Sequence, residues 1–199
     1  MMWSGICTFT TREALHQGPK RLKHNEQHTI RNSNGRALDP IEILMKEHEK
    51  CLQHLARMEN AAEYIQTNGF SHEAYTQIAE TIRFIDTVMR QHDEKEEKYV
   101  FSMMDRHVTG APQVMRNEHR ELWIAFKQLI RTVEDIEEGR LHGTSIVELV
   151  QSAKAVVEHL TSHIAKENEV VFPMAKQMLT KEEYAELRES MAKLPPLVS

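Results

Sequence analysis

A histidine and a glutamate four residues apart, His163 and Glu167, stand in a segment whose apolar residues recur with helical spacing. Four residues make about one helical turn, so the two side chains leave the same helix face, roughly 6 Å apart along its axis. An imidazole and a carboxylate placed in this way can bind one metal ion or two adjacent ones. The same unit occurs earlier in the chain, as His92 and Glu96.

The offset between these two units, from His92 to His163, relates much of the chain to itself. It places Glu47-His48 on Glu118-His119, so each half reads as a histidine, a spacer of the same length, and then His-x-x-x-Glu. Apolar residues also coincide at this offset, in the pairs Leu52 and Trp123, Leu55 and Phe126, Ile85 and Val156, Met89 and Leu160, and Phe101 and Phe172. Two matching halves predict a doubled helical hairpin, because the repeat is too long for a solenoid.

Capping residues predict where the helices that carry these residues begin and end. Asp39-Pro40 is typical of a helix start and Asn68-Gly69 of a helix end. The further signals are Ser71, the break at 105–110, Pro112, Gly139, Ser145 with Glu148, Pro173 as a kink, and Thr180 with Glu183. We therefore predict an all-α, up-down-up-down four-helix bundle at 39–178, after a basic extension at 1–38 and before a short helix and tail at 179–199.

The turns of this bundle fix which residues share a height. Residues equidistant from a turn between antiparallel helices lie at the same level. The three turns lie midway between successive members of the series His48, His92, His119 and His163, so all four imidazoles are expected in one inward-facing layer. One adjacent layer is expected to hold Leu44, Glu96, Met115 and Glu167, and the other a pocket of Leu52, Val88, Trp123 and His159. The run from Asp93 to Lys98 reads otherwise as a solvated helix face.

Four imidazoles and two carboxylates in a core would be very costly to bury without a partner, and a metal removes that cost. Six ligands are too many for one tetrahedral zinc ion. If Glu96 and Glu167 are shared as bridges, each of two metal ions receives two histidines and two oxygens. Nitrogen and oxygen ligands without a thiolate favour iron. The sequence thus predicts a non-haem di-iron centre.

The ordered motif resembles the hemerythrin-like HHE cation-binding family over about residues 39–178. The resemblance rests on His48, His92-x-x-x-Glu96, His119 and His163-x-x-x-Glu167, with Tyr-Val-Phe and Val-Val-Phe-Pro after the two glutamates. It implies two iron ions held by the four histidines and bridged by both glutamates and by an oxo or hydroxo group. The oxygen carriers of this family have a further histidine where Trp123 stands here. We expect His159 either to replace it at the centre or to be a core histidine bonded to a carbonyl.

Three functions suit such a centre. The first is binding of a small diatomic molecule, O2 or NO, for storage, delivery or sensing, which an apolar pocket favours. The second is an enzyme acting on peroxide or nitric oxide, for which His159 is the obvious proton donor. The third is an iron-responsive or iron-centre-repair module whose basic extension contacts a protein partner. Which molecule is bound, and the oligomeric state, do not follow from the sequence.

Composition excludes other classes. Residues 1–38 hold six Lys or Arg against two Glu, although the whole chain carries −5, so the bundle is acidic and a poor nucleic-acid binder. No apolar run approaches the roughly 20 residues of a membrane helix, and the first residues do not read as a signal peptide. The two cysteines, Cys7 and Cys51, form no disulfide framework. We expect a cytoplasmic protein without a membrane partner.

Overall fold

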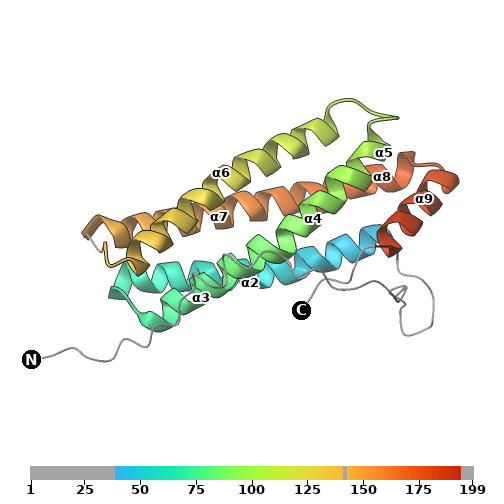
Figure 1. Cartoon of the computed structure of the whole chain (residues 1–199). Helices are drawn as coiled ribbons and strands as arrows, with labels where there is room; N and C mark the ends of the chain where they lie inside the picture. Colours follow the sequence, from blue (N-terminus) through green and yellow to red (C-terminus); the bar gives the residue numbers. More distant parts are fainter. Residues whose placement is uncertain (1–38, 141–142, 194–199) are drawn as a thin grey trace, which may run out of the picture.

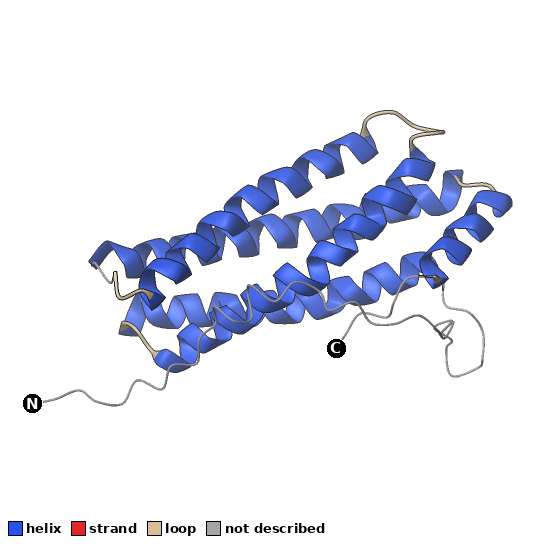
Figure 2. Ribbon diagram, viewed as in Figure 1, coloured by secondary structure: helices blue, strands red, loops and turns tan. Residues whose placement is uncertain are grey.

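The computed structural model describes residues 39–140 and 143–193 of the chain (Figure 1). The predicted basic extension and the tail at 194–199 lie outside these ranges. The described residues form helices and short connections, without a strand (Figure 2). No helix among them combines the length and the apolar character needed to cross a membrane.

The described helices join into four long helical rods, which run alternately up and down (Figure 1). The first rod is α2 (Pro40–Asn68) and the third is α6 (Ala111–Glu137). The second rod joins α3 (His72–Phe84), η1 (Ile85–Met89), α4 (Arg90–Lys95), η2 (Glu96–Phe101) and α5 (Ser102–Met104). The fourth joins α7 (Gly143–Lys166), η3 (Glu167–Val171) and α8 (Phe172–Met178). The predicted up-down-up-down bundle is confirmed.

Local capping explains both ends of the first rod and the start of the second. The Asp39 carboxylate accepts the backbone N–H groups of Ile41 and Glu42 at the start of α2, and Gly69 ends this helix with a φ of 87° that favours glycine. Ser71 caps α3 as predicted. The cap predicted at Ser145 was wrong: α7 already begins at Gly143, so Ser145 lies inside its first turn and donates to the Arg140 carbonyl.

A short helix, α9 (Lys181–Ala192), closes one end of the bundle (Figure 1). The predicted capping box is present, because Thr180 Oγ1 accepts the Glu183 N–H while the Glu183 carboxylate accepts the Thr180 N–H. Tyr184 donates its hydroxyl hydrogen to Asp39 at 2.7 Å and so connects α9 to the start of α2.

Two apolar clusters fill the bundle, one on each side of a polar layer. One cluster includes Cys51, Leu55, Met89, Leu122 and Leu160, and the other includes Leu44, Val100, Phe101, Met115 and Phe172. Between them lie the four histidines, on all four rods. The burial of apolar side chains that holds the rods together also removes this polar layer from water.

The second and fourth rods widen into a π-helical turn at the same place. These turns, η2 and η3, begin at Glu96 and Glu167. A π turn inserts one residue into the helical repeat, so residues four and five positions after each glutamate both face inward. After Glu96 these are Val100 and Phe101, and both are buried.

Candidate metal centre

The structure brings the six predicted ligands together in the middle of the bundle. One histidine comes from each rod, and the two glutamates lie one turn along from His92 and His163 on the second and fourth rods. Every one is at most 4% exposed, namely His48, His92, Glu96, His119, His163 and Glu167. The structure shows that the six side chains lie together, whereas metal binding by them stays a prediction.

Each carboxylate lies between imidazoles of both halves. Glu96 Oε1 is 3.0 Å from His92 Nε2, and its Oε2 is 3.5 Å from His119 Nε2. In the other half, Glu167 Oε2 is 3.2 Å from His163 Nε2 and 3.3 Å from His48 Nε2. Both carboxylates can therefore bridge two neighbouring cations.

Two overlapping donor groups result. We call the first position A, formed by His48, His92, Glu96 and Glu167. The second is position B, formed by Glu96, His119, His163 and Glu167. Within each group the donor atoms lie within 4.8 Å of one another, which is the spacing of ligands around one ion. Each position combines two imidazole nitrogens with oxygens from both shared glutamates, as the sequence predicted.

The outer nitrogen of every imidazole is held by a hydrogen bond. His92 Nδ1 lies 2.8 Å from Glu47 Oε2, and His119 Nδ1 lies 2.8 Å from Glu97 Oε1. The other two contacts are His163 Nδ1 to Glu118 at 3.2 Å and His48 Nδ1 to Asn168 Oδ1 at 2.9 Å. All four partners present an oxygen that accepts, so each Nδ1 carries a hydrogen and each Nε2 faces inward, where it can offer its lone pair to a cation once it is free of a proton.

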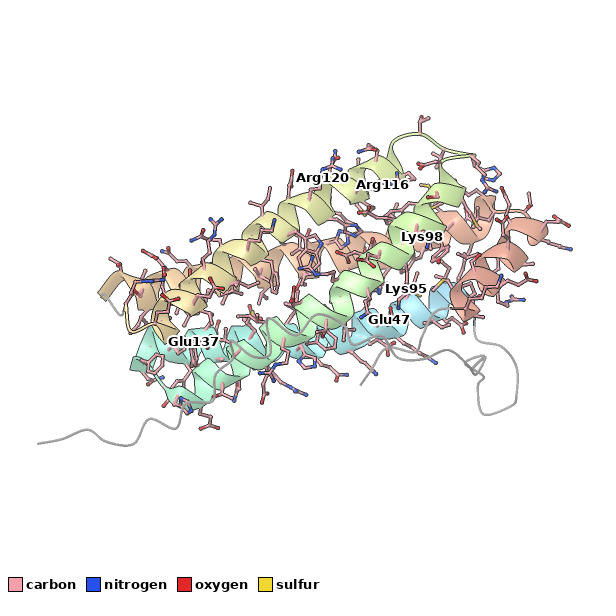
Figure 3. The ribbon with its side chains drawn as sticks, viewed as in Figure 1. Glu47, Lys95, Lys98, Arg116, Arg120 and Glu137 are labelled. Atoms are coloured by element: carbon pink, nitrogen blue, oxygen red, sulfur yellow. The ribbon has the colours of Figure 1, made fainter. Side chains whose placement is uncertain are left out.

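Lysines support two of these carboxylates. Lys95 Nζ lies 2.6 Å from Glu47 Oε1, and Lys166 Nζ lies 2.7 Å from Glu118 Oε1. Figure 3 shows Glu47 and Lys95 next to each other where the first and second rods meet. The lysines fix the carboxylates, which in turn fix the imidazoles, so the inner donor atoms are oriented from outside.

The inner atoms lack the hydrogen bonds that buried polar atoms normally make. His48 Nε2, His92 Nε2 and all four oxygens of Glu96 and Glu167 make no hydrogen bond within the described part of the chain, although they lie close to one another. His119 Nε2 and His163 Nε2 stand 3.0 Å apart, and both aim a lone pair inward when Nδ1 carries the hydrogen. Leaving such atoms unpaired is costly. A pair of cations satisfies all of them, so the donor set fits metal ions.

Without a cation, protons take that role. Burial opposes a charge on His92, but Glu96 and Glu47 outweigh it and raise its pKa well above the usual value. Burial likewise opposes a charge on His119, yet the neighbouring Glu96 and Asp93 raise its pKa to about 10. Burial would raise the pKa of Glu96, whereas His92 and His119 lower it well below its usual range. The centre therefore binds positive charge in either state.

A seventh polar residue, Asp93, lies beside position B. Its side chain is 5% exposed, and Oδ1 is 3.8 Å from His119 Nε2. The Trp123 indole N–H donates to Oδ2 at 2.9 Å, and the Arg90 guanidinium lies over that ring, 4.0 Å from its centroid. Burial raises the pKa of Asp93 to about 6. Reading the run from Asp93 as a solvated face was wrong, since both Asp93 and Lys95 are buried.

The pocket predicted at Leu52, Val88, Trp123 and His159 was also wrong. His159 is exposed, Leu52 is 36% exposed, and Val88 and Trp123 are partly buried. A helical turn contains 3.6 residues, so on this side of the histidines the inward positions are three residues away instead of four. The buried layer consists of Cys51, Met89, Leu122 and Leu160.

Sequence reasoning missed the outer partners, although a signal was present. Glu47 and Glu118 each precede a centre histidine, and Lys95 and Lys166 each precede a centre glutamate, again at the offset that relates the two halves. Such repetition in polar residues marks a shared role in the same way as repetition in the ligands. Asp93 and Glu97 gave no such signal, because Ile164 and Asn168 occupy their equivalent places.

Comparison with known proteins agrees with this geometry. Residues 39–175 match the hemerythrin HHE cation binding domain. A relative, "Zinc finger protein BRUTUS" of Arabidopsis thaliana, is 24% identical over 151 residues, which cover 74% of this chain and 12% of the relative. The chain thus spans a small part of that relative's length. The family match covers all but the last three residues of the four-rod bundle and includes every residue of positions A and B, and the chain belongs to the hemerythrin HHE cation-binding domain family.

Proposed function

We propose that the chain binds two iron ions, one at position A and one at position B, with Glu96 and Glu167 as bridges. The observation that carries this proposal is the donor set: four oriented imidazole nitrogens and four buried carboxylate oxygens that make no hydrogen bond in the described part of the chain. Neither position includes a thiolate. Imidazole and carboxylate donors in this number suit octahedral iron with open positions better than tetrahedral zinc.

The surroundings support binding of a small diatomic molecule, O2 or NO, for storage, delivery or sensing. The iron pair, when bound, supplies the open coordination positions and the electrons that such ligands need. The residues of this chain surround the centre with apolar and aromatic side chains. Cys51, Met89, Leu122 and Leu160 cover one side of the imidazoles. On the other side Phe172 stacks on His48 and Phe101 on His119.

An enzyme acting on peroxide or nitric oxide is the second candidate, and Asp93 is the observation that favours it. Such chemistry needs a proton donor near the bound molecule. The exposed His159 does not fill that role, whereas Asp93 is a buried carboxyl beside position B. In an enzyme, Asp93→Asn protein that has been loaded with its full complement of iron would lose turnover; in a carrier, the wild-type protein would show no turnover to lose.

Metal analysis tests the iron proposal. Protein expressed with ample iron is expected to contain close to two iron ions per chain and to show a near-ultraviolet band from an oxo or hydroxo bridge. His119→Leu should lower the iron content because it removes a donor of position B. One zinc ion per chain, retained after chelation and reconstitution with iron, would contradict the proposal. The lifetime of the reduced protein with O2 or NO then separates a carrier, stable for minutes, from an enzyme.

A further inference from the structure

The two halves of the chain surround the centre with nearly the same contacts. Glu47 contacts both His92 and Lys95, and its equivalent in the second half, Glu118, contacts both His163 and Lys166. Each of these groups spans two rods, and each orients one imidazole. Because the two halves otherwise match, any pair of equivalent residues that differs gives positions A and B different surroundings.

The first difference lies behind the other two imidazoles. Glu97 Oε1 accepts from His119 Nδ1 at 2.8 Å, whereas the equivalent residue Asn168 accepts from His48 Nδ1 through its amide oxygen at 2.9 Å. The hydrogen bonds have the same geometry and nearly the same length. The partner of position B is therefore a carboxylate where that of position A is neutral.

The second difference adds another carboxylate to position B. Asp93 stands 3.8 Å from His119 Nε2, and its equivalent in the second half is Ile164, which is buried and apolar. The Trp123 indole N–H donates a hydrogen bond to Asp93 Oδ2. An asparagine would accept that hydrogen bond equally well, so the contact with Trp123 does not by itself require a charged residue.

The lysines increase the contrast. Lys95, which balances Glu47 at position A, is 11% exposed, whereas Lys166, which balances Glu118 at position B, is 49% exposed. Water screens the positive charge of Lys166 more effectively than that of Lys95. Position A is thus surrounded by a balanced pair and a neutral amide, and position B by a more exposed pair, the buried carboxylate of Asp93 and the partly exposed carboxylate of Glu97.

We infer that the two positions are inequivalent, and that position B takes up a divalent cation first and holds it more tightly than position A. Asp93 and the pair Glu97 and Asn168 set this order. The inference rests on the proposed function, because it takes A and B as metal positions. A carboxylate that accepts from Nδ1–H makes the opposite nitrogen a stronger donor than an amide does, and an outer partner of this kind typically changes metal affinity by about 10- to 100-fold.

Titration of the metal-free full-length protein with Co²⁺, followed by calorimetry and visible absorption, tests the order. Wild-type protein should bind two equivalents in two steps, the first at least about 10-fold tighter than the second. Glu97→Gln should weaken the tight step, and Asn168→Asp should strengthen the weak step, each by about 10- to 100-fold. The double exchange should bring the steps together or invert them.

Two further variants complete the experiment. Asp93→Asn should weaken the tight step while retaining an acceptor for Trp123. Glu94→Gln is the matched control, because Glu94 is an exposed residue of the same helix and should leave both steps unchanged. Glu97 is itself 42% exposed, so its replacement should not prevent folding.

The outcomes separate this inference from the proposed function. Fewer than two Co²⁺ bound by the wild-type protein would contradict the proposed two-metal centre. Two Co²⁺ bound in a single step would leave that centre standing and overturn the inequivalence. Two steps that neither Glu97→Gln nor Asn168→Asp shifts would overturn the assignment to these residues.

Discussion

Each imidazole of the centre is oriented through its outer nitrogen, so no rearrangement of the ring is needed when a cation binds. The carboxylates of Glu96 and Glu167 lie between the rings, completely buried. They belong to both donor groups, whereas each histidine belongs to one. The glutamates are thus the residues whose loss affects positions A and B together.

Glu167→Ala tests this sharing. Removing the carboxylate takes oxygens from both positions, so the variant should bind less than one cation per chain with high affinity. Glu94→Ala, on the exposed side of α4, should retain the wild-type content of two. Metal content measured after gel filtration in the presence of a weak chelator checks both variants. An unchanged content in Glu167→Ala would show that the bridges are dispensable.

Protons compete with the cations for the same atoms. Metal binding needs neutral imidazoles and ionised carboxylates, whereas in the metal-free protein the raised pKa values of His92, His119 and His163 keep protons on the rings. Loading should therefore release protons, and affinity should fall as the pH is lowered. A lightly buffered Co²⁺ titration with a pH indicator measures this release. Affinity that is constant between pH 8 and pH 5 would exclude these imidazoles as ligands.

The sequence located the six central residues because spacing alone determines them. A constant offset between the halves and one helical turn between histidine and glutamate are independent of side-chain packing. The burial of Asp93 and His159 depends on two further things. One is which neighbouring rod packs against the residue, and the other is whether the inward position lies three or four residues from the histidine. Those choices are made by tertiary packing, so Asp93 was read as solvated and His159 as buried.

At the scale of the elements, the π turns η2 and η3 are the feature most closely tied to the centre. Each begins at a bridging glutamate. Pro173 lies just after η3, but the equivalent place after η2 holds Ser102, whose hydroxyl donates to the Glu97 carbonyl that lies five residues earlier. The turn forms in both rods although only one of them has a proline. The proline is therefore tolerated at this place because of the π turn, and it does not cause the turn.

Pro173→Ala tests that order of cause and effect. The variant should retain η3, bind cations as wild type does, and change the free energy of unfolding by less than about 1 kcal/mol. A proline inside a regular α-helix would instead cost about 3 kcal/mol, which its removal would recover. Denaturant unfolding of the metal-free protein, with Co²⁺ titration of the folded protein, measures both quantities. Loss of cation binding would show that the proline forms the turn.

Capping residues predicted several helix ends, because a cap is local chemistry: Asp39, Gly69, Ser71 and Thr180 act where the sequence placed them. The π turns left no such trace. In each π turn a glutamate and two apolar residues all point into the bundle within little more than one helical turn. This arrangement is favourable only after the rods have packed against one another, so the local sequence does not reveal it.

At the scale of the whole molecule, the centre joins the two halves of the bundle. Position A takes three donors from the first half and Glu167 from the second, and position B takes the reverse set. The same layer separates the two apolar clusters of the core. Cations bound here neutralise a layer that otherwise interrupts the hydrophobic packing.

Metal-free protein should therefore melt lower than loaded protein. A cation present at 100 times its dissociation constant adds about 2.7 kcal/mol, which for a domain of this size raises the melting temperature by about 5 to 10 °C. Thermal unfolding followed by circular dichroism, with and without added metal, measures the shift. Glu167→Ala should show no such shift. Equal melting temperatures for metal-free and loaded wild-type protein would mean that the layer is satisfied without cations.

The connection between the halves, residues 105–110, contributes no donor to either position, while both positions draw donors from each side of it. Cutting the chain there would leave two helical hairpins, each holding an incomplete set of ligands for both cations. Their association constant would then depend on the concentration of free metal. The bundle would become a pair of fragments that a metal ion brings together and a chelator separates.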